Sequence, residues 1–256
     1  MPPRNIDING DMGESLGPWL MGQDELLMPW VTAANIACGM HAGDPGTIQT
    51  TIALAAAHQV AIGAHPSYPD LLGFGRRDMA LTPDEVYQTV LYQTGALGAM
   101  ARVAGQRLHH VKPHGALYNK AAVHAPTAVA VVEAVHRLDP GLFLYGPPGS
   151  EMERAARSRG LPFCREVFAD RRYLPDGRLM PRQQPGAVLA SVEMVAAQVE
   201  QILRFGSVTC ADGSTIPLEG DTVCVHGDGE HAVAFAKAVR HAIEAAGMHI
   251  TPSPRP

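Results

Sequence analysis

The sequence has few of the features that a secreted, membrane-bound or redox-active protein requires. Its 256 residues include only four cysteines, which lie far apart and form no C-x-x-C pair, so neither a zinc ribbon nor a redox pair is expected. No apolar run is long enough to cross a bilayer, and the N-terminus lacks the basic and then apolar pattern of a signal peptide. We therefore expect a cytoplasmic protein with no membrane association.

Basic charge and nucleotide-binding motifs are also scarce. Only Lys112, Lys120 and Lys237 are lysines, and the formal net charge is -5. The chain thus has no basic footprint for nucleic acid or an anionic membrane surface. No G-x-G-x-x-G follows the first predicted strand, and no G-x-x-x-x-G-K-[ST] occurs. A dinucleotide crevice and a P-loop are therefore not expected, and any site in the chain is expected to bind a small molecule.

What the sequence does contain is a regular alternation of strand-like and helical segments. Helices are predicted at about 47–58, 82–104, 119–138, 187–205 and 232–246. Strands are predicted from residue 6 and at 33–39, 60–64, 109–115, 142–146, 163–170 and 222–228. This order is typical of an α/β fold with a parallel sheet, either an open doubly wound sheet or a closed barrel.

No linker or shift in composition divides the chain, so one domain over residues 1–256 is expected. Two hairpin-like excursions are predicted within it, near 173–182 and 207–217. Each carries an Asp-Gly turn signal, Asp176-Gly177 in the first and Asp212-Gly213 in the second.

The predicted strands share a pattern of polar residues at their carboxyl ends. Residues two apart lie on one face of a strand, so the first strand places Asp7, Asn9 and Asp11 together, while faces such as that of Ile36 suit packing against helices. In α/β barrels the active site is built where the strands end. The other same-face sets are Asn35, Ala37, Gly39 and His41; Ala61, Gly63 and His65; His110, Lys112 and His114; Cys164, Glu166, Phe168 and Asp170; and Cys224, His226 and Asp228.

Motifs along nearly the whole chain resemble the LamB/YcsF family. They are D-x-N-x-D-x-G-E-S at 7–15, A-N-I-A-C-G-x-H-A-G-D-P at 34–45, G-A-H-P-S-Y-P-D-x-x-G-F-G-R-R at 63–77, V-K-P-H-G-A-L-Y-N at 111–119, E-V-F-A-D-R-x-Y at 166–173, P-R at 181–182 and V-H-G-D at 225–228. The resemblance implies a seven-stranded parallel (β/α) barrel, similar to a TIM barrel and of the glycoside hydrolase and deacetylase type. It also implies a subunit that acts with two partners, the further 5-oxoprolinase subunits PxpB and PxpC, to open 5-oxoproline to L-glutamate with hydrolysis of ATP to ADP and phosphate.

The chemistry of that reaction suggests roles for the strand-end residues. A lactam is a resonance-stabilised amide, so we hypothesise that ATP phosphorylates its oxygen and that water then attacks the ring carbon. ATP is then a co-substrate, accompanied by Mg²⁺, and the partner subunits are expected to handle it, because this chain has no nucleotide motif of its own. Catalytic candidates are Asp11, His41, His65, Lys112 and His114, as water activators or, for Lys112, as a cation for the lactam oxygen or phosphate. Substrate-binding candidates are Asp7, Asn9, Asn35, Arg76, Glu166, Asp170, Arg182, His226 and Asp228, among which a loop arginine can hold the substrate carboxylate.

A metal site is an open alternative. Asp11, His41 and His65 have the residue types of the Asp-His-His site in related deacetylases, but they lie on three strands and show no short-range ligand spacing such as H-E-x-x-H. No metal is assigned firmly on these grounds. Two other functions also stay open: a self-sufficient metal-dependent hydrolase or deacetylase on the same barrel, and a non-catalytic regulatory or accessory protein of carbohydrate or lactam utilisation.

Overall fold

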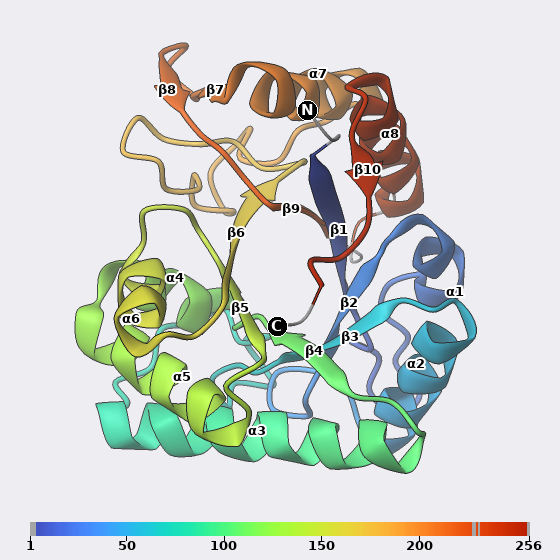
Figure 1. The fold of residues 1–256 in the computed structure, drawn as a ribbon, viewed down its shortest axis with the longest axis vertical. Helices are drawn as coiled ribbons and strands as arrows, with labels where there is room; N and C mark the ends of the chain where they lie inside the picture. Colours follow the sequence, from blue (N-terminus) through green and yellow to red (C-terminus); the bar gives the residue numbers. More distant parts are fainter. Residues whose placement is uncertain (1–3, 227–228, 230, 255–256) are drawn as a thin grey trace.

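Seven parallel strands form a closed barrel at the centre of the protein (Figure 1). The structure, a computed structural model, describes residues 4–226, 229 and 231–254. The strands are β1 (Asn5–Met12), β2 (Ala33–Ala37), β3 (Ala61–His65), β4 (Leu108–Val111), β5 (Phe143–Gly146), β6 (Phe163–Phe168) and β9 (Thr222–Val225). They pair in this order, and β9 pairs with β1 to close the ring. The expected seven-stranded (β/α) barrel is confirmed, and the open doubly wound sheet is wrong.

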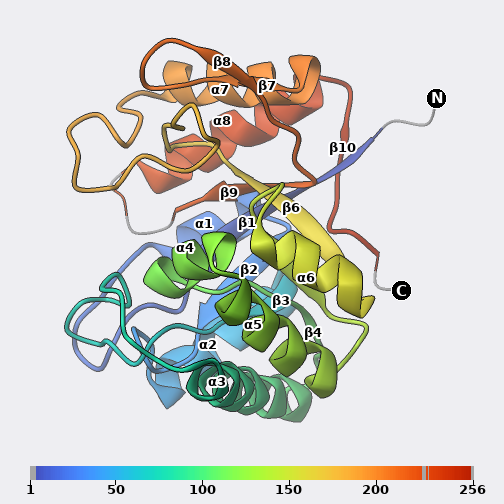
Figure 2. The ribbon, with the colours of Figure 1, turned by 90° about the vertical axis from the view of Figure 1, so that its left-hand side faces the viewer.

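The helices form an outer layer around the strands (Figures 1 and 2). Their longest member is α3 (Pro83–Val103), which packs against α5 (Ala125–Leu138). A reciprocal capping box starts α3, because the Thr82 hydroxyl accepts from the Glu85 amide and the Glu85 carboxylate accepts from the Thr82 amide. The other helices are α1 (Asp24–Leu27), the 3-10 segment η1 (Met28–Trp30), α2 (Pro45–Ala57), α4 (Gly115–Val123), α6 (Glu151–Arg159), α7 (Val192–Phe205) and α8 (Ala232–Ala245).

Side chains alternate along each strand between two buried regions, an apolar layer between the strands and the helices and a polar interior of the barrel. Ile36, Ile62 and Val111 point away from the barrel axis and are buried under the helices. Side chains of the opposite parity, such as Asn35 and Lys112, meet inside the barrel through hydrogen bonds and ion pairs. The apolar layer therefore stabilises the fold, while the polar one fills the barrel.

The amino-terminal end of the barrel is covered by the end of the chain. A two-residue strand, β10 (His249–Ile250), pairs in parallel with the start of β1, and the segment after it runs toward the centre of the ring in Figure 1. There the Ser253 carbonyl lies 2.7 Å from His109 Nε2 and accepts a hydrogen bond from it. Access to the barrel interior is thus left to the carboxyl ends of the strands.

Two helix predictions differ from the structure, several strands end before the residues predicted for them, and one short strand was not predicted. The single helix expected over 119–138 is two helices, because Pro126 lies in the first turn of α5 and His124 is extended between α4 and α5. The helix expected from 187 begins at Val192, where the Ser191 hydroxyl caps it. The strand β10 was not predicted, since two residues carry no periodicity.

The two excursions lie between β6 and β9. Residues 207–217 form an antiparallel hairpin of β7 (Ser207–Thr209) and β8 (Thr215–Pro217). In the other, Tyr173 and Leu179 form an isolated antiparallel bridge around a turn in which Gly177 has a φ of 81°. No helix in the described part of the chain is long and apolar enough to cross a membrane.

Candidate active site

A cavity of about 700 Å³ opens at the carboxyl ends of the barrel strands. Its floor comes from residues at the ends of β1, β3, β4 and β6, and its rim from the loops and helices that follow these strands. Eight of the residues predicted from the sequence line it: Asp11, His65, Arg76, Lys112, His114, Glu166, Arg182 and His226. The rule that residues two apart share one face of a strand therefore correctly predicted that side chains from separate strands meet at one cavity.

Lys112 is the centre of the floor. Its side chain is 3% exposed, and its Nζ lies 2.8 Å from Asp11 Oδ1 and 3.0 Å from Glu166 Oε1. Nζ also donates to Asn9 Oδ1 at 3.2 Å and contacts Cys224 Sγ at 3.1 Å. Burial lowers the pKa of Lys112, but the Asp11 carboxylate and its neighbours outweigh it and hold this pKa well above its ordinary value. Lys112 is therefore a desolvated ammonium between two carboxylates.

Asp11 is ionised for the same reason. Burial raises its pKa, but the positive charge of Lys112, followed by the neighbouring His65 ring, holds this pKa well below the ordinary 3.8. The Asn35 amide adds a hydrogen bond from Nδ2 to Asp11 Oδ1 at 2.8 Å. A carboxylate with this environment is a weak base and a strong orienting partner for a cation.

A second polar layer lies beneath the floor. Asn35 Nδ2 donates to Asn9 Oδ1 at 2.7 Å, and Asn9 Nδ2 donates to the Thr222 hydroxyl at 2.8 Å. His110 Nε2 donates to Asn35 Oδ1 at 2.7 Å, which fixes the orientation of the amide. Asn9 and Asn35 thus support Lys112 from below and are outside the cavity lining.

Asp7 lies deeper still, at the amino-terminal side of the barrel. It is fully buried and accepts hydrogen bonds from the hydroxyls of Thr32, Thr222 and Tyr145, the last two at 2.8 Å each. Burial raises its pKa, and these hydrogen bonds offset only part of that effect. These surroundings are those of a structural carboxyl group. Asp7 is not among the residues that line the cavity, so its contact with substrate stays a prediction.

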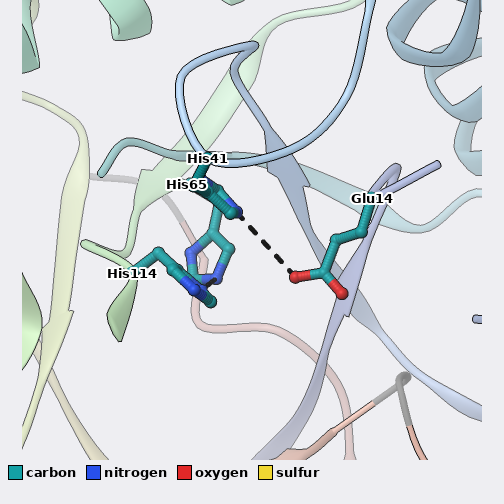
Figure 3. A group of neighbouring side chains, drawn as sticks. All are labelled: Glu14, His41, His65 and His114. Atoms are coloured by element: carbon teal, nitrogen blue, oxygen red, sulfur yellow. Dashed lines mark hydrogen bonds and ion pairs between the residues drawn. The ribbon is translucent and has the colours of Figure 1, made fainter. Parts of the chain in front are cut away.

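Three histidines and a glutamate gather beside Asp11 (Figure 3). His65 Nε2 lies 3.4 Å from Asp11 Oδ2 and 3.0 Å from His114 Nδ1. His41 stacks on His114 with ring centroids 4.0 Å apart, and its Nε2 lies 3.9 Å from Glu14 Oε1. Burial lowers the pKa of both His41 and His114 well below the ordinary 6.5. Both rings are therefore neutral at physiological pH.

The loop after β3 builds one wall of this group. Gly75 has a φ of 63°, and a Cβ atom there would lie 2.1 Å from the Ser67 hydroxyl oxygen and 2.9 Å from atoms of His41 and His114. Glycine thus allows the loop to approach the rings, and the adjacent Phe74 carbonyl accepts from His114 Nε2 at 2.9 Å.

His226 and Asp170 form a separate pair on the other side of the floor. His226 Nδ1 lies 2.9 Å from Asp170 Oδ2 and 3.0 Å from Oδ1, and its ring stacks on Phe168. Burial raises the pKa of Asp170, but His226 and the nearby Arg171 and Arg182 lower it more, so the carboxylate is ionised. An ionised carboxylate on Nδ1 orients an imidazole and leaves Nε2 for proton transfer.

Arginines surround the cavity mouth. Arg76 and Arg182 line it, as does Arg171, which sequence reasoning did not select although it directly follows Asp170. Arg171 is 8% exposed, and one of its guanidinium nitrogens donates to the Met180 carbonyl at 2.6 Å. Arg154 and Arg178 also belong to the lining, and guanidinium groups gathered at one opening suit anionic groups such as carboxylate or phosphate.

Two groups of side chains in the described part of the chain have the types and spacing to bind a cation. One is Glu14, His41, His65 and His114, and the other is Asp11, Cys224 and His226; within each, ligand atoms lie within 4.8 Å of one another. The Asp11–His41–His65 set predicted from the sequence is split between them. Asp228, a predicted substrate-binding residue, lies outside the described residues.

A profile of the LamB/YcsF family matches residues 6–256 of the chain. The chain belongs to the LamB/YcsF family. The protein named as the A subunit of 5-oxoprolinase in Methylococcus capsulatus is 53% identical to it over 247 residues, which span 96% of this chain and 95% of that protein. Its namesake in Bacillus subtilis is 49% identical over 246 residues, 96% of each chain.

A solved structure shares the fold of this LamB/YcsF chain. The crystal structure of the lactam utilization protein from Thermus thermophilus has a TM-score of 0.90 and 46% sequence identity, and the match covers 96% of this chain and 99% of that one. The motifs that carry the family resemblance supply residues of the cavity: Lys112 and His114 come from one, and Glu166 comes from another, together with Asp170, which contacts the lining residue His226.

Proposed function

We propose that this chain is the barrel subunit of an ATP-dependent 5-oxoprolinase, which opens the lactam of 5-oxoproline to L-glutamate while ATP is hydrolysed to ADP and phosphate. The observation that carries the proposal is the near-full-length similarity, at about half of all positions, to proteins named as the A subunit of 5-oxoprolinase. Those names also support partner subunits, and we propose two, PxpB and PxpC, which bind ATP with its Mg²⁺. A role in 5-oxoproline metabolism agrees with the name of the Thermus thermophilus lactam utilization protein.

The size and charge of the cavity support this substrate. Its volume of about 700 Å³ lies within the range of about 300–1,000 Å³ usual for small-molecule sites, so a five-membered lactam fits together with a phosphoryl group. The floor is polar and the mouth carries guanidinium groups. We assign the carboxylate of 5-oxoproline to Arg171, and the phosphoryl group to Arg76 and Arg182 at the mouth.

The floor residues act on the lactam itself. ATP forms the bond between its γ-phosphorus and the lactam oxygen, and ADP leaves. Glu166 accepts the hydrogen bond of the lactam N–H before this step, and the Lys112 ammonium supplies positive charge where negative charge develops. Asp11 holds Lys112 in position and keeps it protonated.

The pair of Asp170 and His226 moves the proton. His226 takes a proton from the attacking water as the new C–O bond forms at the ring carbon, and Asp170 stabilises the resulting imidazolium. The imidazolium then gives this proton to the ring nitrogen, and the C–N bond breaks as the new hydroxyl becomes the carbonyl of the acyl phosphate and its proton passes to the freed amine. A second water hydrolyses the acyl phosphate to glutamate and phosphate. Because Asp11 is a weak base beside Lys112, His226 takes the role that the sequence suggested for Asp11.

Reconstitution tests the proposal. The purified chain alone is expected to show no 5-oxoproline-dependent ATP hydrolysis, and to gain it, with one L-glutamate per ADP, when the two partner subunits are added. Both products are measured, by coupled assay for ADP and by chromatography for glutamate. Failure of the mixture to release glutamate would contradict the proposal, and robust hydrolysis of an amide or acetyl substrate by the chain alone would favour a self-sufficient hydrolase instead.

A further inference from the structure

The hydrogen bonds of His65 and His114 determine which ring nitrogens carry protons. His65 Nδ1 lies 2.7 Å from the Lys112 carbonyl oxygen, and His114 Nε2 lies 2.9 Å from the Phe74 carbonyl oxygen. A carbonyl oxygen only accepts, so each of these nitrogens carries its hydrogen. The other two ring nitrogens, His65 Nε2 and His114 Nδ1, face each other 3.0 Å apart. Two unprotonated nitrogens at that distance repel, so either a proton or a cation has to lie between them.

The ring nitrogens of His41 are also buried without hydrogen-bond partners among the described residues. Its ring is 1% exposed, and neither Nδ1 nor Nε2 makes a hydrogen bond to any of the residues that the structure describes. A buried polar atom without a partner costs about 1–3 kcal/mol. His41 stacks on His114, and Glu14 lies across from it (Figure 3). His41 is therefore held next to the two facing nitrogens by stacking and by its 3.9 Å contact with Glu14, without a hydrogen bond to the described residues.

We propose that His41, His65 and His114, together with Glu14, bind one divalent transition-metal cation of the zinc type. One cation between the rings accepts the lone pairs of His65 and His114, provides a partner for a nitrogen of His41, and takes a carboxylate oxygen of Glu14 as its fourth ligand. Three imidazole nitrogens favour Zn²⁺, Co²⁺ or Ni²⁺ over Mg²⁺ and Ca²⁺, which prefer oxygen.

The spacing of the ligand atoms agrees with such a site after a small closure. Four ligands bound tetrahedrally at about 2.0–2.1 Å from zinc lie about 3.3–3.4 Å from one another. The His65–His114 pair is at 3.0 Å, and all four residues offer atoms within 4.8 Å. Rotation of the His41 and Glu14 side chains brings the wider distances into range, and no hydrogen bond of His41 to the described residues opposes it.

Two alternatives explain less. The group of Asp11, Cys224 and His226 has similar spacing, but the Lys112 ammonium lies 2.8 Å from Asp11 and 3.1 Å from Cys224, where it repels a second cation. A proton shared by His65 and His114 removes the repulsion between them but leaves both nitrogens of His41 without a hydrogen bond to the described residues. Only a cation serves all three rings.

The site would place a positive charge close to the reacting groups. His65 also contacts Asp11, at 3.4 Å, and both His65 and His114 line the cavity. When bound, the cation adds a Lewis acid to the floor beside Lys112. The inference does not rest on the proposed function, because binding is measured on the chain alone and with no substrate.

Metal titration of the purified full-length chain tests the proposal. After treatment with a chelator and removal of it, Zn²⁺ and Co²⁺ are titrated by calorimetry, and the Co²⁺ form is examined for visible absorption from nitrogen ligands. We expect one equivalent of each ion to bind and Mg²⁺ not to compete. His41→Gln removes a ligand without removing a hydrogen bond, so the variant is expected to fold and to bind Zn²⁺ about 100-fold or more weakly, since loss of even an outer partner of a ligand costs about 10–100-fold.

Matched variants separate the alternatives. His58→Gln on the exposed end of α2 is expected to bind Zn²⁺ like the wild type, as is Cys224→Ser, which changes a residue of the rival group and none of the four proposed ligands. His114→Gln is expected to lose binding as His41→Gln does. Absence of saturable Zn²⁺ binding would leave only the shared proton, and loss of binding in Cys224→Ser with retention in His41→Gln would move the ion to the rival group; either result overturns the proposal.

Discussion

Replacing Lys112 by methionine is expected to destabilise the chain strongly. The substitution keeps most of the side-chain volume but leaves Asp11 and Glu166, at 2.8 and 3.0 Å from the lost ammonium, as two buried carboxylates without a counter-charge. Removing one partner of a buried ion pair costs about 3–5 kcal/mol, out of a total free energy of unfolding of about 5–15 kcal/mol. Urea unfolding at pH 7, followed by circular dichroism, measures this loss.

Lys120→Met is the matched control. Lys120 Nζ also lies 3.0 Å from a carboxylate, that of Asp78, but these side chains are 38% and 59% exposed. An exposed pair contributes about 0–1 kcal/mol, so the control is expected to unfold near the wild-type urea concentration. If Lys112→Met and Lys120→Met unfolded within about 1 kcal/mol of each other, the inferred role of the buried ammonium would be refuted.

The same substitution can be tested by measuring how the free energy of unfolding changes with pH, because the account predicts the direction of that change. In the wild type the pKa of Asp11 lies below its ordinary 3.8, so its contribution to the free energy of unfolding is present above pH 3.8 and is lost as the pH falls through the lower folded value. In Lys112→Met, burial without a counter-charge raises the pKa of Asp11 above that of the unfolded chain. The variant is then least destabilised at acid pH and loses stability as the pH rises, whereas a deficit that does not change with pH would exclude this cause.

Three further substitutions test the site and the barrel around it. In the reconstituted complex Arg171→Lys should raise KM for 5-oxoproline about tenfold with little change in kcat, because a fork of two hydrogen bonds becomes a single point charge; an unchanged KM would remove Arg171 from carboxylate binding. Asp170→Asn should lower kcat about 100-fold or more, because His226 loses the partner that orients it and stabilises its charge, and its pH–rate profile should shift to lower pH; an unaltered profile would contradict that role. Gly63→Ala should destabilise the chain by about 1–3 kcal/mol or more in urea unfolding, because the added methyl would lie 2.1 Å from His110 Nε2 inside the barrel; wild-type stability would mean that the barrel interior is looser than described.

The sequence predicted the polar interior because that interior depends on a period of two, whereas the closed barrel was predicted from the family resemblance. Ile36 and Val111 on one parity, and Asn35 and Lys112 on the other, needed only the rule that strand side chains alternate. Six of the seven predicted strands carry such a polar face. Lys112 could therefore be placed at the floor from parity alone.

Side chains beyond the strand ends could not be placed by the same rule. Glu14 follows Gly13, whose φ of 70° turns the chain, and β2 ends at Ala37, so a turn and not a strand brings His41 to His114. The sequence alone does not determine the path of such a turn, so the positions of Glu14 and His41 could not be predicted from it. Arg171 was missed for a related reason, since a strand-end position alone does not distinguish a cavity arginine from a solvated one.

The sequence also could not predict which ring nitrogen of each histidine carries a hydrogen. Whether His65 is a base or a ligand depends on which carbonyl group its Nδ1 meets, and that carbonyl belongs to Lys112, which follows the neighbouring strand. Register between β3 and β4 decides this contact, and register follows from packing of the whole barrel.

The most direct test of the proposed mechanism is the initial rate of L-glutamate release from 5-oxoproline by the complex of this chain with its two partner subunits and ATP, compared between wild type and Asp11→Asn. The asparagine keeps the shape of Asp11 but not the charge that positions Lys112, and Asp84→Asn, at an exposed position in the first turn of α3, is the control. We predict a loss of about 100-fold or more for Asp11→Asn, because a small displacement of a catalytic group costs that much, and none for the control. A wild-type rate in a complex that assembles with Asp11→Asn would show that the lactam is opened elsewhere.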